Sequence, residues 1–436
     1  MAEKTKKIGP FQRPKGTADI LPEEEPYWER IRKVVSAFAH AYGFSRIETP
    51  LIEESALFER SVGEATDIVE KQMYTFRTRG GDSLTLRPEG TAPIARVYIE
   101  EGMANLPQPV KLYYIGPMFR YEQPQAGRYR QFHQFGVEII GEQDSASDAQ
   151  TMQLFWIIFQ ELGIKKIHFE VNSLGCPQCR PKYRTELKEY YRPKTAKLCP
   201  DCRRRLKENP LRLLDCKNER CQELKANAPH LIDHLCQECH NHFTSVLEFL
   251  DELEIPYLLN PHLVRGLDYY TKTVFEGKLL SDSGVEESAR VQELGGGGRY
   301  DKLIELLGGK DTPGVGWAAG VERAILVMKA LGIAVPVVTP EPKVFLAQLG
   351  DLGKKRSLKL FEELRRAGIP VAESFGRSSI KAQLRIADKL GVAVALILGQ
   401  KEALDGNIIL REMRSGVQEI IPLGRFIEEL KKRLKK

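Results

Sequence analysis

All eight cysteines of this 436-residue chain lie in one segment, between residues 176 and 239. They are Cys176 and Cys179, Cys199 and Cys202, Cys216 and Cys221, and Cys236 and Cys239. Most of these pairs have the C-x-x-C spacing that is typical of zinc ligands, and eight thiolates are enough for two tetrahedral sites. The sequence therefore predicts a segment supported by metal, but it leaves open which pairs share an ion.

Other roles for these thiols fit the sequence less well. The N-terminus, MAEKTKKIGPF, has no apolar run that could act as a signal peptide, and no stretch approaches the roughly 20 apolar residues of a membrane span. We therefore expect a cytoplasmic protein without a membrane partner, and disulfides are rare in that reducing compartment. A redox-active pair would be expected in a thioredoxin-like βαβ pattern, which is absent, and reduced surface thiols remain the alternative.

The hydropathy pattern divides the chain into two domains and an insertion. Residues 1–335 read as a sheet-containing domain, which the cysteine-rich segment 175–242 interrupts with short charged helices. Three prolines between residues 336 and 342 favour an extended linker. Strands alternating with amphipathic helices then predict a separate α/β domain at residues 342–436.

The stretch from Phe119 to Gly141 is the first candidate for a binding surface. Its alternation predicts two strands joined by a turn at Gln125-Ala126-Gly127, with Arg120, Arg128 and Arg130 near the turn. A surface hairpin with solvated arginines is the simpler interpretation. However, Glu138 lies between Val137 and Ile139, and a carboxylate within an apolar strand favours a face that meets a ligand.

Three other stretches insert charge into apolar surroundings: LRPEGT at 86–91, LVRGLDYY at 263–270 and GVGWAAGVER at 314–323. The glycines of the last stretch would allow close approach to a flat ring or a phosphate. No P-loop and no Rossmann fingerprint occurs, so a nucleotide site would be of another kind. The net charge of +6, from 65 basic and 59 acidic residues, permits a nucleic-acid partner without requiring one.

These motifs carry a family resemblance. Pro50, F-R-x-E at 119–122 and G-x-E-R at 320–323 resemble motifs 1, 2 and 3 of the class II aminoacyl-tRNA synthetases. Within that class, LVRGLDYYTKTVFE and GGGGRYD resemble the two signature peptides of the histidyl-tRNA synthetase family, and RYRQFHQFGVEIIG resembles its bacterial form. The resemblance covers nearly the whole chain.

The resemblance implies an α+β fold. Its parts are a six-stranded antiparallel class II sheet, a helical insertion that reaches towards the tRNA acceptor arm, and a C-terminal α/β anticodon-binding domain. It implies a homodimer, and the activity of a histidine-tRNA ligase. Such an enzyme activates L-histidine with ATP and Mg²⁺, then transfers it from the adenylate to the 3′ end of tRNA(His).

The resemblance also assigns roles to individual residues of this sequence. The α-phosphate residues, expected to be catalytic, are Arg120 and Arg265. The ATP-binding residues are Arg120, Glu122, Arg128, Arg130 and Arg323. The histidine-binding residues are Glu89, Thr91, Gln134, Glu138, Arg265, Tyr269 and Tyr270, with Glu138 and Tyr270 at the imidazole.

The sequence departs from the family in two places. Gln123 stands where relatives often carry Arg, which affects the expected contact with the acceptor end. Many relatives lack the insertion cysteines, so the expected metal is a structural Zn²⁺ rather than a catalytic ion. An inactive paralogue that regulates ATP phosphoribosyltransferase is the alternative, but it typically lacks the C-terminal domain and the motif residues that stand here. Synthetases for proline, threonine or glycine do not fit LVRGLDYY.

Overall fold

A computed structural model describes residues 10–64, 66–123, 127–280, 293–336, 342–377 and 379–434. The chain forms two compact units, Met1–Val335 and Pro336–Lys436, and each is described by itself. The expected turn residues Gln125 and Ala126 and most of the expected linker lie outside the described residues.

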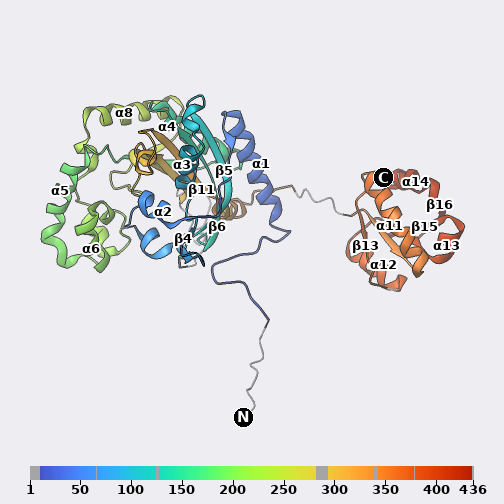
Figure 1. Cartoon of the computed structure of the whole chain (residues 1–436). Coiled ribbons are helices and arrows are strands. Elements are labelled where there is room, and N and C mark those ends of the chain that lie inside the picture. Colours follow the sequence, from blue (N-terminus) through green and yellow to red (C-terminus); the bar gives the residue numbers. More distant parts are fainter. Residues whose placement is uncertain are drawn as a thin grey trace, which may run out of the picture. The chain divides into compact units, whose positions relative to one another are not determined.

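The first unit is built on an eight-stranded sheet with the order β1-β5-β6-β11-β10-β9-β7-β8 (Figure 1). The six strands from β5 to β7 are antiparallel, and one short parallel strand extends each edge, so the sheet is wider than the six strands expected. The bounds in that order are Ser45–Arg46, Val110–Phe119, Gln131–Ile140, Gly314–Gly320, Glu293–Arg299, Thr271–Leu279, Ile167–Ser173 and Tyr257–Leu259. The predicted class II sheet core is confirmed by this antiparallel centre together with the family matches described below.

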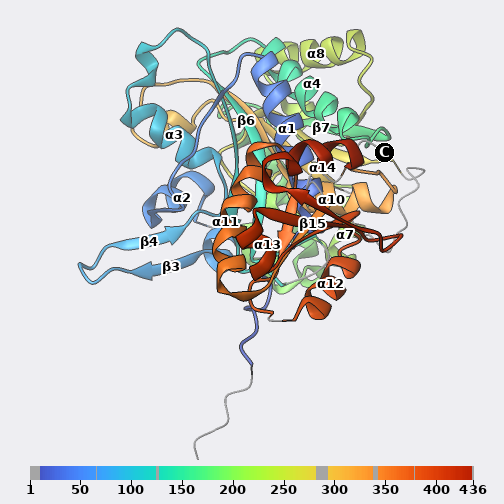
Figure 2. The ribbon, with the colours of Figure 1, turned by 90° about the vertical axis from the view of Figure 1, so that its right-hand side faces the viewer.

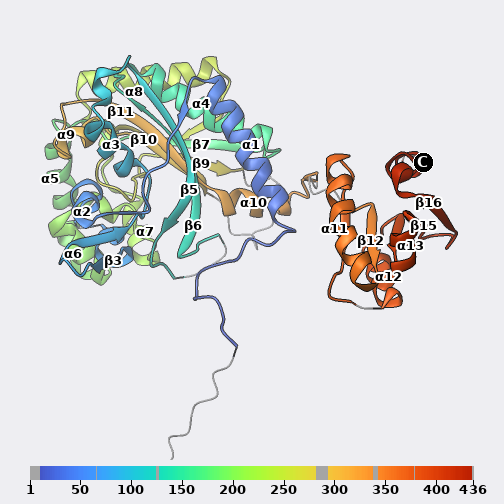
Figure 3. The same ribbon diagram turned by 45° about the vertical axis from the view of Figure 1, so that its right-hand side comes forward.

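Alternation along the strands sends side chains to two different cores. In β6, Phe135, Val137 and Ile139 face four helices, whose apolar stripes bury them. Figure 3 shows α1 and α4 running along this side of the sheet. These helices are α1 Glu25–Ala41, α4 Ala146–Glu161, α8 Gln237–Glu252 and α10 Val321–Ala330.

The opposite face of the sheet carries Glu138 and a second core. Its apolar residues come from the sheet, from α3 (Thr91–Glu100) and α9 (Leu303–Leu306), and from the insertion. The insertion is therefore packed on the sheet domain through buried side chains such as Leu213, which shares this core with Leu263 and Tyr270.

The insertion consists of short helices, as its charged pattern predicts. Its α-helices are α5 Arg180–Tyr191, α6 Pro200–Glu208 and α7 Glu219–Lys225, and its 3₁₀ turns are Arg192–Lys197, Pro210–Leu213 and Leu231–His234. The next helix, α8, begins within the expected insertion and continues past its expected end at residue 242.

A small antiparallel sheet, β2-β4-β3, stands beside the main one, and Figure 2 shows its β3-β4 hairpin projecting from the unit. The strands are β2 Ile52–Glu54, β3 Tyr74–Arg77 and β4 Ser83–Leu86, with α2 Ser55–Val62, a π-helical turn Ile68–Gln72 and a 3₁₀ turn Met103–Asn105 nearby in the chain.

Only the second half of the signature peptide LVRGLDYYTKTVFE forms a strand. Strand β9 begins only at Thr271, so residues 263–270 form an irregular loop. In the other peptide, GGGGRYD, Arg299 is fully buried and pairs with Asp148 of α4, which holds the pKa of that carboxyl at about 2 against the effect of burial. Arg299 is therefore part of the framework of the fold.

The second unit has a five-stranded sheet, β13-β12-β14-β15-β16, in which β13, β12 and β14 are parallel and the last two strands antiparallel. The strands are β12 Val344–Gln348, β13 Val371–Glu373, β14 Val394–Leu398, β15 Asn407–Glu412 and β16 Gln418–Pro422. The helices are α11 Gly350–Arg366, α12 Ile380–Lys389, α13 Gln400–Asp405 and α14 Phe426–Leu434, with a 3₁₀ turn Leu423–Arg425. Among the described residues, no helix is both long and apolar enough to cross a bilayer.

Candidate active site

A cavity of about 770 Å³ opens on the sheet face that carries Glu138. Strands β6, β9, β10 and β11, the loop 263–270, the segment 119–130 and the insertion all contribute to its walls. The expected substrate residues that line it are Glu89, Thr91, Arg120, Glu122, Arg128, Gln134, Arg265, Tyr269, Tyr270 and Arg323. Glu138 and Arg130 are not among the residues that line it, although Glu138 contacts Thr91 in the wall.

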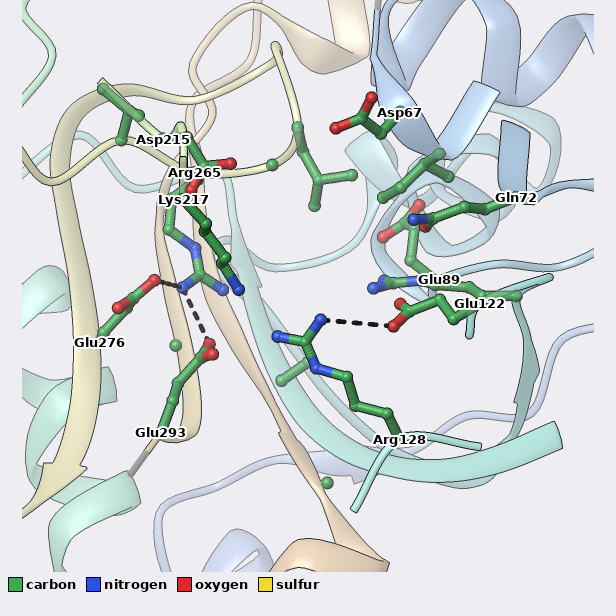
Figure 4. A pocket seen from close by; sticks show the side chains of 18 of the residues that line it. Asp67, Gln72, Glu89, Glu122, Arg128, Asp215, Lys217, Arg265, Glu276 and Glu293 are labelled. Atoms are coloured by element: carbon green, nitrogen blue, oxygen red, sulfur yellow. Dashed lines mark hydrogen bonds and ion pairs between the residues drawn. The ribbon is translucent and has the colours of Figure 1, made fainter. Parts of the chain in front are cut away.

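Arg265 is held between two carboxylates, as Figure 4 shows. Its Nη1 lies 2.6 Å from Glu276 Oε1 and 3.4 Å from Glu293 Oε1. Burial alone would lower the pKa of Arg265, but these carboxylates more than offset that effect and raise it. Its buried Nε has no hydrogen-bond partner among the described residues, so the guanidinium keeps a free donor inside the site.

Glu293 also joins Arg265 to Arg323. The Nη1 of Arg323 donates to the Glu293 main-chain oxygen at 3.0 Å and lies 3.3 Å from its Oε2. Glu276 and Glu293 were missed by the sequence reading, although Glu276 belongs to the signature peptide and Glu293 opens ELGGGGRY. Their positions beside Arg265 depend on the pairing of β9 with β10, which no local pattern specifies.

The cations of the 119–130 segment have different surroundings. Arg120 is half-buried, with Nε donating to Pro88 O at 2.8 Å and its guanidinium over the Phe132 ring, and desolvation lowers its pKa. Arg128 lies 3.6 Å from Glu122 across the cavity wall. Arg130 stacks on Tyr121, 3.9 Å from the ring centre, and its Nε donates to Glu122 O at 3.3 Å.

Glu138 is fully buried and bonded on both oxygens. Its Oε1 accepts from the Thr91 hydroxyl at 2.7 Å, and its Oε2 accepts from the Tyr300 hydroxyl at 2.6 Å. Burial raises the pKa of Glu138 to about 8, because these two bonds do not replace the lost hydration of the carboxylate. Tyr300 was also missed by the sequence reading, although it stands in GGGGRYD.

Glu89 lies at the start of α3. Its carboxylate accepts from the main-chain N–H groups of Thr91 and Ala92, each at 2.7 Å, and Tyr269 donates to it at 3.4 Å. Burial raises its pKa, and the two main-chain bonds oppose that rise. The Thr91 and Tyr269 bonds both go to Oε2, whereas Oε1 accepts only from Ala92, so Glu89 can accept one further bond at Oε1 from a group in the cavity.

Two other polar groups face this end of the cavity. Burial raises the pKa of Tyr270 to about 12, so its phenol remains a proton donor at neutral pH. The Oε1 of Gln134 is buried and has no hydrogen-bond partner among the described residues. An unpaired buried acceptor is unfavourable unless a ligand supplies the donor.

Two glycines, Gly316 and Gly296, leave room for the side chains of Glu138 and Arg265. A Cβ on Gly316 would lie 1.9 Å from Glu138 Oε2, and a Cβ on Gly296 would lie 2.7 Å from Arg265 Nη1. Any side chain at either position would occupy the volume of a site residue, which explains glycine in the two sheet strands that form the floor.

The cysteines gather into two clusters of four. Cys176, Cys179, Cys236 and Cys239 form the first cluster, and Cys199, Cys202, Cys216 and Cys221 form the second. Four thiolates at about 2.3 Å from one zinc lie about 3.8 Å apart, and the measured Sγ separations include 3.6 and 3.9 Å in the first cluster and 3.8 Å in the second. Both donor sets therefore fit a tetrahedral metal ion.

Comparison with known proteins matches this geometry to one family. A model of histidyl-tRNA synthetase matches residues 16–324, and a model of an anticodon-binding domain matches residues 343–433. The chain belongs to the histidyl-tRNA synthetase family. It is a ligase of the aminoacyl-tRNA synthetase type, as the resemblance in its sequence predicted.

Relatives of this family match along nearly the full chain. A histidine–tRNA ligase of Dehalococcoides mccartyi is 50% identical, covering 97% of this chain and 100% of that protein. One from Desulforudis audaxviator is 48% identical, covering 97% and 99%. The apo histidyl-tRNA synthetase of S. aureus has a TM-score of 0.76 at 36% identity, covering 97% of this chain and 100% of that one.

Proposed function

We propose that this synthetase joins L-histidine to tRNA(His) through histidyl-adenylate, in the cytoplasm and as a homodimer. The observation that carries the choice of amino acid is a fully buried Glu138 behind a cavity lined by arginines. The carboxylate of histidine attacks the α-phosphorus of ATP in line, and pyrophosphate leaves. Such a transfer depends on positioning and on neutralising charge more than on acid or base catalysis.

The arginines have separate tasks in this proposal. Arg120 and Arg265 bind the α-phosphate, where charge develops in the transition state. Arg323 holds the γ-phosphate end, Glu122 contacts the adenine or a network linked to Mg²⁺, and Arg128 contacts ATP. Arg130, like Arg128, belongs to the segment that meets ATP and the acceptor end of the tRNA, although it does not line the cavity in this structure.

Histidine binds at the other end of the cavity. Glu89, Thr91 and Gln134 receive the α-amino group, whose N–H donors can bond to the unpaired Gln134 Oε1 and to Glu89 Oε1. Glu138 and Tyr270 take the two nitrogens of the imidazole, with Tyr269 packed beside Tyr270. Because Glu138 lies behind Thr91 in this structure, its contact with the imidazole requires the Thr91 side chain to move when histidine binds. An analogue without either nitrogen leaves a buried polar group unpaired, at a cost of about 1–3 kcal/mol.

The cysteine clusters hold structural Zn²⁺ ions. Their Sγ separations suit tetrahedral coordination, and four thiolates leave no open position for a substrate. The first cluster joins the start of the insertion to its end, and the second lies within it. The metal therefore supports the insertion, which contacts the acceptor arm, while the second unit reads the anticodon. Gln123 weakens the acceptor contact without affecting adenylate formation.

The proposal is tested by exchange of labelled pyrophosphate into ATP, without tRNA, across all twenty amino acids. Exchange with histidine alone is the expected result. An Arg265→Ala variant purified in the same way controls for contaminating synthetase. Folded protein that shows no exchange with any amino acid would overturn the proposal and favour the regulatory paralogue.

A further inference from the structure

The second cysteine cluster lies against the active site, whereas the first does not. Cys199 and Cys216 line the cavity, together with neighbours in the insertion such as Asp215 and Lys217. Figure 4 shows Lys217 extending into the cavity on the side where Arg265 lies. A metal at this cluster therefore fixes main chain that forms one wall of the substrate cavity.

Arg212 connects this wall to the signature loop. It lies between Cys202 and Cys216 in sequence, and only 5% of it is exposed. Its Nη2 donates to Gly266 O at 2.7 Å, and its Nε donates to Asp268 Oδ1 at 3.2 Å. Asn209, one turn earlier, donates to the other Asp268 oxygen at 3.0 Å.

The loop depends on such contacts because it has no strand partners of its own. Residues 263–270 precede β9, so sheet hydrogen bonds do not fix them. On the side away from Arg212, the Asp268 N–H donates to Val62 O at 3.0 Å. Gly63, at φ +99°, leaves room for the Asp268 side chain, since a Cβ there would lie 2.6 Å from its Oδ2. Asp268 is thus clamped between the insertion and the end of α2.

Arg265 is one residue from Gly266, so the clamp also fixes the main chain from which Arg265 reaches the cavity. We infer that Arg212, braced by a metal-bound second cluster, is a positioning residue for Arg265. The inference rests on the proposed function. A small displacement of a catalytic group lowers the rate of a transfer that depends on alignment, even when the substrates still bind. The metal thereby supports catalysis through a protein contact, without touching the substrates.

The test compares Arg212→Ala with the full-length wild-type protein in three measurements. Native mass spectrometry counts bound zinc, hydrogen–deuterium exchange follows peptides that cover residues 263–270, and pyrophosphate exchange gives kcat and KM. We expect unchanged zinc content, faster deuterium uptake in that loop, and a kcat lower by about 10- to 100-fold with KM for ATP and histidine within about threefold.

Two further variants show whether the effect comes from this contact. Arg184→Ala is the matched control, because Arg184 also lies in the insertion but donates to Glu208 O at an exposed site. It should change neither loop uptake nor kcat. Arg212→Lys keeps a positive charge and one donor group, but it lacks the planar guanidinium that bonds to Gly266 and Asp268 together. Its kcat should therefore lie between those of wild type and Arg212→Ala.

Unchanged loop uptake and unchanged kcat in Arg212→Ala would overturn the inference. If that variant fails to fold, Asp268→Asn removes the charge that Arg212 meets while keeping the side-chain shape, and is judged by the same criteria. The deuterium measurement does not need activity. A wild-type protein without histidine-dependent exchange would therefore defeat the proposed function, while loop uptake would still decide whether Arg212 holds the loop.

Discussion

The hydroxyl of Tyr300, at the end of β10, donates a 2.6 Å hydrogen bond to Glu138 in β6, although β11 lies between these strands. The bond crosses above β11 at Gly316, where the absence of a Cβ leaves room for the carboxyl group. The end of the cavity where we propose that the imidazole binds is therefore supported by residues in or directly after three adjacent strands.

Glu138→Gln should make stability less dependent on pH. The folded pKa of Glu138 is about 8, above its ordinary value, so between about pH 5 and 8 the folded protein keeps a proton that the unfolded chain has lost. The contribution of Glu138 to the free energy of unfolding is therefore fully present at low pH. It declines by about 1.4 kcal/mol per pH unit as the pH rises through that window. Urea unfolding at several pH values should show the stability of the variant, relative to wild type, rising with pH. Glu428→Gln, at an exposed site, is the control, and a pH-independent difference for Glu138→Gln would contradict the assignment.

Arg265→Ala should abolish most adenylate formation while the protein remains folded. We expect kcat for pyrophosphate exchange to fall about 100- to 1,000-fold, because the guanidinium acts on charge that develops in the transition state. Arg365→Ala, which removes an exposed arginine from the second unit, should leave exchange unchanged. A loss that appears only in KM for ATP would show that Arg265 binds the ground state instead.

Gly316→Ala should destabilise the protein and weaken binding at the end of the cavity where we propose that histidine binds. Its Cβ would lie 1.9 Å from Glu138 Oε2 and 2.3 Å from Val137 O, and the second of these is main chain that cannot turn aside. We expect a loss of about 1–3 kcal/mol in the free energy of unfolding and a higher KM for histidine. Gly424→Ala has nothing within 4 Å of its Cβ and should change neither quantity. Wild-type stability and KM in Gly316→Ala would contradict the close approach.

The cysteine clusters should load and lose metal separately. Native mass spectrometry of the wild-type protein should show two Zn²⁺ per chain, because each cluster supplies four thiolates. Cys176→Ser and Cys221→Ser should each lose one ion, from different clusters. Loss of both ions from either single variant, with the fold intact, would show that the two sites are interdependent.

Much of the fold was predictable because it follows from local patterns. The alternation in the stretch from Phe119 to Gly141 predicted the β5-β6 hairpin, and the charged pattern of residues 175–242 predicted the short helices of the insertion. The irregular loop before Thr271 was not predictable, because its apolar and aromatic residues resemble a strand while its actual contacts come from Arg212 and Val62.

The site could be predicted only as far as family motifs extend. Arg265 and Glu138 were identified from motif matches, and the structure places Arg265 in the cavity wall and Glu138 directly behind it. Tyr300 stands in the GGGGRYD peptide and Glu293 lies close to it in sequence, but their contacts with Glu138 and Arg265 could not be predicted, because strand order sets them. Likewise, cysteine spacing predicted metal binding but not the pairing of Cys176 with Cys236 across the length of the insertion.

The first cysteine cluster also has a consequence for folding of the chain. Strand β7 ends at Ser173, and its sheet partner β9 begins only at Thr271, so the insertion and α8 must be looped out before these strands can pair. A metal ion that joins Cys176 and Cys179 to Cys236 and Cys239 shortens the effective loop, and closing a shorter loop costs less conformational entropy. We expect zinc, when it binds early, to speed the pairing of β7 with β9 and so the completion of the sheet.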